Sequence, residues 1–342
     1  MSENKTYAPR GAKELLLTVA NSPEEWSRKF GDLNARTAVT IGNFDGVHLG
    51  HQKILHRVDD YCALQGSRYK SAEILIPTVL TFYPHPTRVI RPDASPALLM
   101  TLDQRLAAFE QFHIHAALVL EFTRDLAQLT PESFVQRYLV DTLRTRAVFV
   151  GENFRFGHKQ AGDVNLLRQL GERFGFQTEP VAPVVVDGMI VSSTAIREAV
   201  SEGRVDPARK LLGRPYALAG EIRRGTGMGS KFVVPTLNLA IKQELLPKLG
   251  VYATEVILDG KRYQAATNVG VRPTFDGGSV SVESHLIDFN TARTDGPIEV
   301  RFHKRIRDEQ RFPNPEALRE QILRDIQESR DYFQSQSANA NS

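Results

Sequence analysis

Apolar residues in the first half of the chain form short runs that alternate with longer stretches at helical spacing. The short runs, each typical of a buried strand, are residues 37–42, 74–82, 116–120, 147–150 and 184–186. Pro77 is expected to interrupt the second run. Amphipathic stretches lie between the runs, most clearly over residues 102–112 and 131–143. Strands separated by helices predict a parallel sheet covered on both faces, and therefore an α/β fold.

The pattern changes after about residue 213, where strand-like segments follow one another directly. These segments are residues 251–258, 261–269, 280–287 and 298–302. Asp259-Gly260 separates the first two and is typical of a tight hairpin turn. Consecutive hairpins without intervening helices predict a small antiparallel β-barrel.

A C-terminal helix is expected over residues 315–332, and the Ser/Asn/Gln-rich residues 334–342 are expected to fray. The seam between the two halves should fall between residues 203 and 215, across a short helix at residues 207–212. A chain of 342 residues suits two domains of ordinary size.

Composition narrows the class of protein. Hydrophobic residues make up 41% of the chain and charged residues 24%, and no apolar run is long enough to span a bilayer. The first ten residues lack the apolar core of a signal peptide. The one cysteine, Cys62, excludes an internal disulfide and a thiolate metal cluster, which fits a reducing cytoplasm. A net charge of +3 is too small to indicate nucleic acid by itself.

The first strand leads into Asn43-Phe-Asp-Gly-Val-His48-Leu-Gly-His51, where a helix is expected to begin. Free backbone N–H groups and the positive end of the helix dipole suit a phosphate chain. Histidines at this position could donate to phosphoryl oxygens, and Gly50 would let the backbone approach the ligand. The segment therefore predicts a nucleotide site, against the plainer alternative of a polar strand-to-helix turn.

A second turn into a helix is expected at Val191-Ser-Ser-Thr194-Ala-Ile-Arg197, with Ser193 or Thr194 as the cap. Arg197 would then lie in the first turn, where a cation opposes the helix dipole. This placement is favourable if an anion binds at that helix end. The alternative is an arginine that extends into solvent.

The second half carries a glycine-spaced loop from Gly225 through Gly227 and Gly229, which leads into a strand at Thr236 and Asn238. Alternate glycines expose backbone N–H groups to phosphates. Residues two apart on a strand share a face, and hydroxyl and amide oxygens are hard ligands suited to Mg²⁺. The pattern therefore predicts a second phosphate site, which would also bind a metal ion; for Thr236 and Asn238 alone, the alternative is an ordinary start of a strand.

The strand over residues 280–287 places Glu283 and His285 on one face, opposite Val282, Ser284 and Leu286. Glu283 should therefore point away from the apolar layer. A carboxylate in that position is available as a general base.

Taken together, these segments resemble bacterial bifunctional FAD synthetases over about residues 14–333. Such proteins combine riboflavin kinase with FMN adenylyltransferase. Three further segments belong to the same resemblance: Thr81-Phe-Tyr-Pro-His85-Pro86, Val150-Gly-Glu-Asn153-Phe-Arg-Phe-Gly157 and Asn268-Val-Gly-Val-Arg272-Pro-Thr-Phe275. The resemblance implies a Rossmann-like nucleotidyltransferase domain over residues 14–205, a riboflavin kinase barrel with its C-terminal helix over residues 206–334, and a flexible tail over residues 335–342.

The resemblance also implies roles for individual residues. The catalytic residues would be His48 and His51 on the ATP phosphates, Arg197 closing over them, and Glu283 as the base for the ribityl hydroxyl. Contacts to ATP or phosphate would come from Gly42, Asn43, Phe44, Asp45, Gly50, Ser192, Ser193, Thr194, Gly227, Gly229 and Lys231. Contacts to flavin would come from His85, Pro86, Asn153, Phe154 and Arg272. Thr236 and Asn238 would hold Mg²⁺.

The implied partners are ATP, riboflavin and FMN in the cytoplasm, without nucleic acid or membrane; the oligomeric state stays open, and a monomer is compatible with it. The chain departs from the family at Ser230, where arginine is usual, and at Val233, where glycine is common; Lys231 could compensate. One alternative is therefore an FMN adenylyltransferase with a flavin-binding, weakly active or inactive barrel. Another is a nucleotidyltransferase for a different substrate, with the barrel as a binding module.

Overall fold

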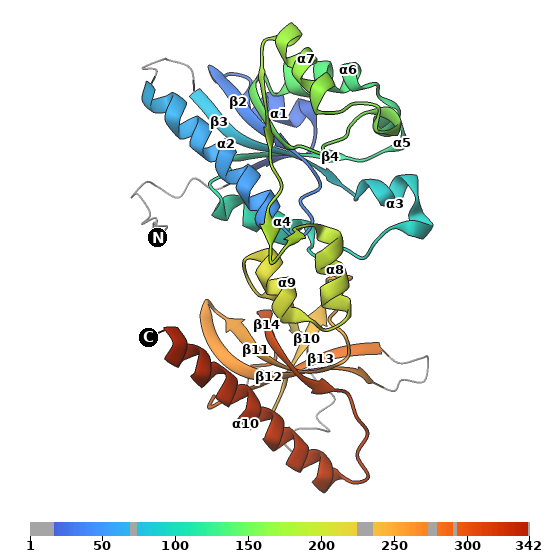
Figure 1. Ribbon diagram of the computed structural model, residues 1–342, viewed down its shortest axis with the longest axis vertical. Helices are drawn as coiled ribbons and strands as arrows, with labels where there is room; N and C mark the ends of the chain where they lie inside the picture. Colours follow the sequence, from blue (N-terminus) through green and yellow to red (C-terminus); the bar gives the residue numbers. More distant parts are fainter. Residues whose placement is uncertain (1–16, 69–73, 224–234, 273–278, 290–292, 341–342) are drawn as a thin grey trace. The chain divides into compact units, whose positions relative to one another are not determined.

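The computed structural model describes residues 17–68, 74–223, 235–272, 279–289 and 293–340. The chain forms two compact units, drawn in Figure 1. The sheet unit consists of Met1–Phe44, His51–Ser95 and Leu102–Pro183. The barrel unit consists of Asp45–Gly50, Pro96–Thr101 and Val184–Ser342. Two short segments of the first half, one of which carries His48, therefore belong to the barrel unit.

The sheet unit is built on six parallel strands in the order β1-β4-β3-β2-β5-β6. Their bounds are β1 Thr18–Ala20, β2 Ala35–Ile41, β3 Ile74–Tyr83, β4 Ala116–Glu121, β5 Thr145–Gly151 and β6 Gln177–Val181. From β2 the chain adds β3 and β4 on one side and β5 and β6 on the other. The order therefore reverses between β2 and β5, and open α/β sheets bind ligands at the carboxyl ends of the strands beside such a reversal.

Helices cover both faces of this sheet. They are α1 (Pro23–Phe30), α2 (Leu49–Arg68), α3 (Pro86–Ile90), α4 (Leu102–Gln111), α5 (Arg124–Gln128), α6 (Pro131–Phe134), the wide turns of η2 (Val135–Thr142), α7 (Val164–Phe174), and the short η1 (Pro92–Ala94) and η3 (His158–Gln160). Leu139 of η2 and Leu167 of α7 share a core cluster with Val148 of β5. On the opposite face, Tyr61 of α2 meets Phe149 edge-on, with ring centroids 5.4 Å apart. The predicted α/β fold is confirmed.

The structure corrects several expected strands. β3 runs through Pro77 without interruption: β4 pairs with it only from Thr78 onward, and the Pro77 carbonyl still accepts from the amide of His115 at 3.0 Å. Residues 184–186 are not the last strand of the sheet. Val185–Val186 (β7) instead pairs with Met189–Ile190 (β8) in a hairpin whose turn residues, Asp187 and Gly188, have positive φ. β6 takes the place at the sheet edge.

The barrel unit closes six antiparallel strands in the order β10-β13-β12-β11-β14-β9, as the antiparallel pattern predicted. Their bounds are β9 Tyr216–Arg223, β10 Leu237–Ile241, β11 Gly250–Leu258, β12 Lys261–Arg272, β13 Ser279–Leu286 and β14 Pro297–Asp308. The hairpin turn at Asp259 and Gly260 has the two positive φ angles, 51° and 73°, that such a turn requires.

In the described part of the barrel unit, the helices are α8 (Ser193–Ser201), α9 (Val205–Leu212) and α10 (Pro315–Ala340). α10 is tied to β14 by Asp325, whose carboxylate accepts from Nε (2.9 Å) and Nη2 (2.7 Å) of Arg307. The helix continues past the expected end at residue 332. It runs to Ala340, into the residues expected to fray, and there Ser335 and Ser337 donate their hydroxyls to the carbonyls of Tyr332 and Phe333.

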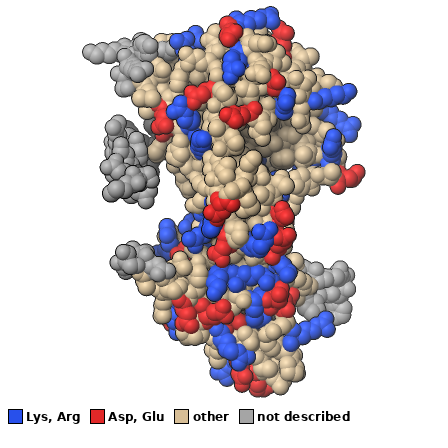
Figure 2. Space-filling model, viewed as in Figure 1, with Lys and Arg blue, Asp and Glu red and all other residues tan. Residues whose placement is uncertain are grey.

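Basic and acidic side chains are interspersed over the face drawn in Figure 2, as 43 Lys and Arg against 40 Asp and Glu lead one to expect. Among the described helices, none combines the length and apolar character needed to cross a lipid bilayer.

Candidate active sites

The loop after β2 begins at the reversal point of the sheet. The Gly42 amide donates to the Leu80 carbonyl at 3.1 Å, and the Asn43 carbonyl accepts from Nη1 of Arg105 at 2.7 Å. Arg105 is only 3% exposed and also lies 3.4 Å from the Thr81 hydroxyl. Sequence reasoning missed Arg105, because a single arginine inside an amphipathic helix has no motif around it.

Phe44 does not present its ring to a ligand. Its ring is 2% exposed and packs edge-on against Phe109 and His51, with centroids 5.4 Å and 5.1 Å away. Its φ of 51° gives the backbone an abrupt turn here. The predicted ATP contact of Phe44 can therefore involve only its backbone, while its side chain supports His51.

Asp45 binds the barrel-unit segments around it. Its carboxylate accepts from the amides of Leu99 (3.0 Å) and Met100 (3.2 Å) and from Nη2 of Arg197 (2.7 Å). Nε of Arg197 donates to the Ala97 carbonyl at 3.0 Å. The side chain of Asp45 is 4% exposed and that of Arg197 is 16% exposed. Arg197 therefore does not extend into solvent, and it already has an acidic partner.

The cap of α8 is Ser192, one residue earlier than expected. Its hydroxyl accepts from the amide of Ala195 at 3.2 Å. Ser193 instead donates its hydroxyl to the Asp45 carbonyl at 2.8 Å, and Thr194 is exposed. Because the helix starts at Ser193, Arg197 lies at the start of its second turn rather than in its first.

His48 directly precedes α2 and is 7% exposed. Burial, with a smaller contribution from the nearby cations of Arg214 and Arg197, lowers the pKa of His48 to about 4, so the imidazole is neutral at physiological pH. A side chain on Gly50 would place its Cβ 3.1 Å from the His48 ring. Gly50 thus makes room for His48, a role different from the expected approach of the backbone to a ligand.

The predicted flavin contacts lie at strand ends and in a partly helical segment of the sheet unit. His85 caps α3: its Nδ1 lies 3.3 Å from the Thr87 amide and 2.7 Å from the Thr87 hydroxyl. Pro86 is the first residue of that helix, and the short η1 follows it. Asn153 is exposed just beyond β5, and the ring of Phe154 stacks at 5.5 Å on Phe156, which belongs to the core.

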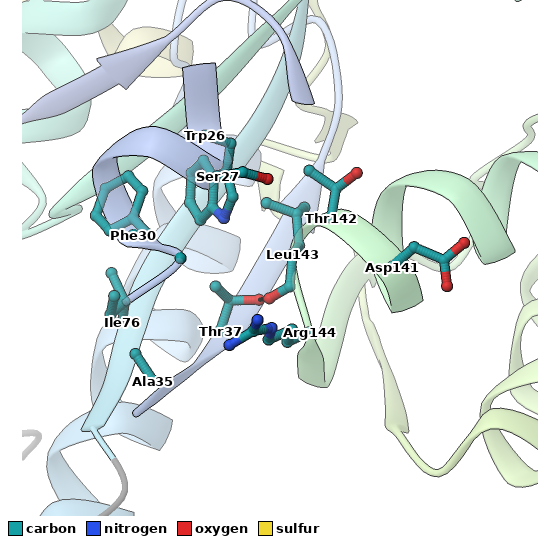
Figure 3. Close-up of a pocket in the computed structure, with 11 residues that line it drawn as sticks. Trp26, Ser27, Phe30, Ala35, Thr37, Ile76, Asp141, Thr142, Leu143 and Arg144 are labelled. Carbon is teal, nitrogen blue, oxygen red and sulfur yellow. Dashed lines mark hydrogen bonds between the residues drawn. The ribbon is translucent and has the colours of Figure 1, made fainter. Parts of the chain in front are cut away.

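A pocket in the sheet unit lies near the starts of β2 and β5 (Figure 3). There Thr37 donates its hydroxyl to the Leu143 carbonyl at 2.8 Å. The pocket is lined by Trp26, Ser27, Phe30, Gly31, Ala35, Thr37, Ile76, Asp141, Thr142, Leu143 and Arg144. These lining residues include none of the predicted contacts, which follow the carboxyl ends of the same strands.

Three polar residues form a row across the barrel. Glu283 of β13 is in register with Asn238 of β10 on one side and with Asn268 of β12 on the other. Val282 and Ser284, which flank Glu283, are 1% exposed and face the interior, so Glu283 belongs to the outer face of its strand, as expected, while Asn238 opposite it is buried at 8% exposure. Opposed residues on one face have Cβ atoms about 4.5–5.5 Å apart. The register therefore brings Asn238 and Glu283 together.

Other predicted residues of this half are only partly described. Thr236 directly precedes β10, and His285 Nδ1 lies 2.9 Å from the neighbouring Pro235 carbonyl. Gly227, Gly229, Ser230, Lys231 and Val233, and the side chain of Arg272, lie outside the described residues.

Family models match both halves of the chain: one described as FAD synthetase matches residues 32–195, and one described as riboflavin kinase matches residues 212–333. A crystal structure described as a macrolide-efflux protein from Streptococcus pneumoniae has a TM-score of 0.78 and 24% identity, covering 92% of this chain and 99% of that chain. At this identity the likeness concerns the fold alone.

Curated relatives named bifunctional riboflavin kinase/FMN adenylyltransferase align over most of the chain. The protein of Pseudomonas fluorescens is 38% identical over 293 residues, which cover 85% of this chain and 91% of the relative. That of Escherichia coli K12 is 35% identical, covering 86% and 92%, and that of Haemophilus influenzae is 34% identical, covering 87% and 94%. Nothing in these matches favours a barrel that only binds flavin. The chain therefore belongs to the bifunctional riboflavin kinase/FMN adenylyltransferases, which phosphorylate riboflavin to FMN with ATP and then adenylylate FMN to FAD.

Proposed function

We propose that Glu283 is the general base of the riboflavin kinase reaction. The observation that carries this role is the row Asn238–Glu283–Asn268, which holds a carboxylate on the outer surface of the barrel between two amides. Glu283 would take the proton of the ribityl hydroxyl as that oxygen attacks the γ-phosphorus of ATP and ADP leaves. Arg272 at the end of β12 would contact the flavin, and Gly227, Gly229 and Lys231 the phosphates.

Thr236 and Asn238 are our proposed ligands for Mg²⁺ in this half. A hydroxyl and an amide oxygen are hard donors, and the register places the Glu283 carboxylate opposite Asn238. This donor set fits a magnesium ion that also binds nucleotide phosphates. When bound, the ion would neutralise charge on the transferred phosphoryl group.

For the adenylyl transfer, we propose that the segment from Gly42 to His51 holds the phosphates of ATP. An oxygen of the FMN phosphate attacks the α-phosphorus and pyrophosphate leaves, a displacement that needs positioning and charge stabilisation but no covalent nucleophile. His48 and His51 would donate hydrogen bonds to the phosphoryl oxygens. Because the pKa of His48 is low, its imidazole is neutral and would act as a hydrogen-bond donor, not as a general acid. Nε and Nη2 of Arg197 are engaged by Ala97 and Asp45, so Nη1 is the atom we propose for phosphate.

His85, Pro86, Asn153 and Phe154 stay our proposed flavin contacts in this half, with Ser192, Ser193 and Thr194 beside the phosphates. We place the boundary between the two activities at residues 205 and 206, which fits family matches that end at residue 195 and begin again at residue 212. We propose a cytoplasmic enzyme that acts on ATP, riboflavin and FMN and binds no nucleic acid.

The test of the kinase site is Glu283→Gln, which keeps the shape but cannot accept the proton. Riboflavin phosphorylation should fall by about 10²–10⁴, the range for a positioned base. Riboflavin binding and FAD formation from supplied FMN should persist. Glu320→Gln is the matched control, because Glu320 lies exposed on α10. Phosphorylation by Glu283→Gln at the rate of this control would show that Glu283 is not the base.

A further inference from the structure

Arg214 lies between the C-cap of α9 at Gly213 and the start of β9, outside every motif that the sequence offers. Its guanidinium donates two hydrogen bonds to the backbone of the loop that carries His48. Nη2 donates to the Gly46 carbonyl at 2.8 Å, and Nη1 donates to the Val47 carbonyl at 3.0 Å. Nη1 also donates to the Leu212 carbonyl at 3.3 Å, which ties the guanidinium to the end of α9.

The two carbonyls belong to residues with unusual backbone conformations. Gly46 has φ of 88° and Val47 has φ of 37°, both in the left-handed region. A β-branched residue such as Val47 is unfavourable there, so surrounding contacts must hold it in place. The loop is also closely packed at this point, because a Cβ on Gly46 would lie 2.8 Å from Leu99 Cδ1.

His48 is the next residue after Val47, so whatever fixes the Val47 peptide sets the direction in which the imidazole leaves the chain. The guanidinium also acts on His48 through its charge: burial lowers the pKa of His48, and the Arg214 cation adds to that effect. Arg214 is itself partly buried, which lowers its own pKa. A planar, two-pronged cation suits this task better than the single ammonium of lysine.

We propose that Arg214 is a positioning residue for FMN adenylylation, which holds the Gly46 and Val47 carbonyls so that His48 is presented correctly to the phosphates. Arg214 lies within residues 212–333, the part of the chain that matches the riboflavin kinase model. The segment assigned to one activity thereby supplies a structural part of the other. This inference rests on the proposed role of His48.

The test measures FMN adenylylation and riboflavin phosphorylation on single preparations of the full chain, as wild type, Arg214→Gln, Arg214→Lys and Arg214→Ala. Arg214→Gln should lower kcat for FAD formation by about 10–10², the effect of misplacing a positioned group, with the KM for ATP nearly unchanged. Arg214→Lys should be intermediate. Guanidinium at a low, non-denaturing concentration should restore part of the activity of Arg214→Ala, and FMN formation should stay near wild type in all variants. Arg204→Gln is the matched control, since Arg204 is half exposed and pairs with Glu202 on the surface.

The inference is overturned if Arg214→Gln forms FAD as fast as Arg204→Gln. It is also overturned if Arg214→Gln and Arg214→Ala lose both activities together with thermal stability and guanidinium restores neither, because Arg214 is then only structural. His48→Ala is run in parallel. If His48→Ala forms FAD normally, the proposed role of His48 fails and this inference fails with it; if only the Arg214 variants are normal, the role of His48 stands and the inference alone fails.

Discussion

His48 has an environment that ordinary histidines lack. It is almost fully enclosed, Gly50 leaves space for its ring, and two arginines add positive charge around it. Burial and like charge both disfavour the protonated form, so they lower the pKa in the same direction. The consequence is a histidine that stays neutral over the whole physiological range.

This environment should appear in the pH dependence of stability. In the unfolded chain His48 has its ordinary pKa of 6.5, and in the folded chain about 4. Between these values the unfolded state binds a proton that the folded state does not, so stability is lost as pH falls through this window. At about 1.4 kcal/mol per pKa unit, the loss amounts to roughly 2–3 kcal/mol.

Urea unfolding of wild type and His48→Gln at pH 7 and pH 4.5 measures how much of the loss of stability at low pH comes from His48. Glutamine does not titrate, so the variant should lose roughly 2 kcal/mol less than wild type between the two pH values. His113→Gln serves as a control, because His113 is largely exposed beside Asp59. Identical losses in wild type and His48→Gln would show that the pKa of His48 is not depressed.

At the scale of elements, α10 is fixed to the barrel by apolar packing of Ile326 on Ala266 and Ile287 and by a buried carboxylate, that of Asp325. Asp325 is 4% exposed and accepts from both Arg307 and Gln321, the latter at 2.8 Å. A buried ion pair need not stabilise more than a hydrophobic contact, but removal of one partner leaves an unpaired buried charge. The helix therefore depends on Asp325 being present with its charge.

Asp325→Ala should lower the free energy of unfolding by about 3–5 kcal/mol, because the Arg307 guanidinium loses its partner. Glu202→Ala breaks a surface pair with Arg204 and should cost at most about 1 kcal/mol. Denaturant unfolding followed by circular dichroism compares the two. Equal costs for Asp325→Ala and Glu202→Ala would mean that this contact does not hold α10.

The hydrophobic pattern predicted many of the longer strands and helices, but it did not single out β9 or α7, and it failed where tertiary contacts determine the structure. β1 is three residues long and has no readable periodicity, yet it pairs with β4. Inside the barrel the hydroxyls of Thr254, Thr267 and Ser284 bond one another at 2.6 and 2.8 Å, so polar residues occupy positions that alternation alone treats as apolar.

The residues of the candidate sites also divide into those that the sequence indicates and those that only the fold reveals. His48, His51, Asn238 and Glu283 could be singled out because each stands in a spaced motif. Arg105 and Arg214 could not, because each acts on backbone carbonyls from a distant part of the sequence, and nothing near them in the chain indicates such a partner. The Asp45–Arg197 pair spans 152 positions, so its existence also requires the fold.

At the scale of the whole molecule, two chemistries occur in one chain, and we propose that they use different residues. The proposed donors of the adenylyl transfer, His48 and His51, lie around the start of α2, and the proposed base of the kinase, Glu283, lies on β13. Each reaction transfers a phosphorus group from ATP, and the product of the first is the substrate of the second. If the sites are separate, a substitution should be able to stop riboflavin phosphorylation while FMN adenylylation continues, or the reverse.

The most direct test supplies riboflavin, ATP and Mg²⁺ to wild type, His48→Ala and Glu283→Gln and resolves the flavins by chromatography over time. Wild type should form FMN and then FAD. His48→Ala should accumulate FMN, with FAD formation lowered by about 10²–10³ through loss of one donor to the transition state. Glu283→Gln should leave riboflavin unconverted but form FAD once FMN is added. If either variant loses both steps to the same extent while remaining folded, the two reactions do not use separate residues, and the account is wrong.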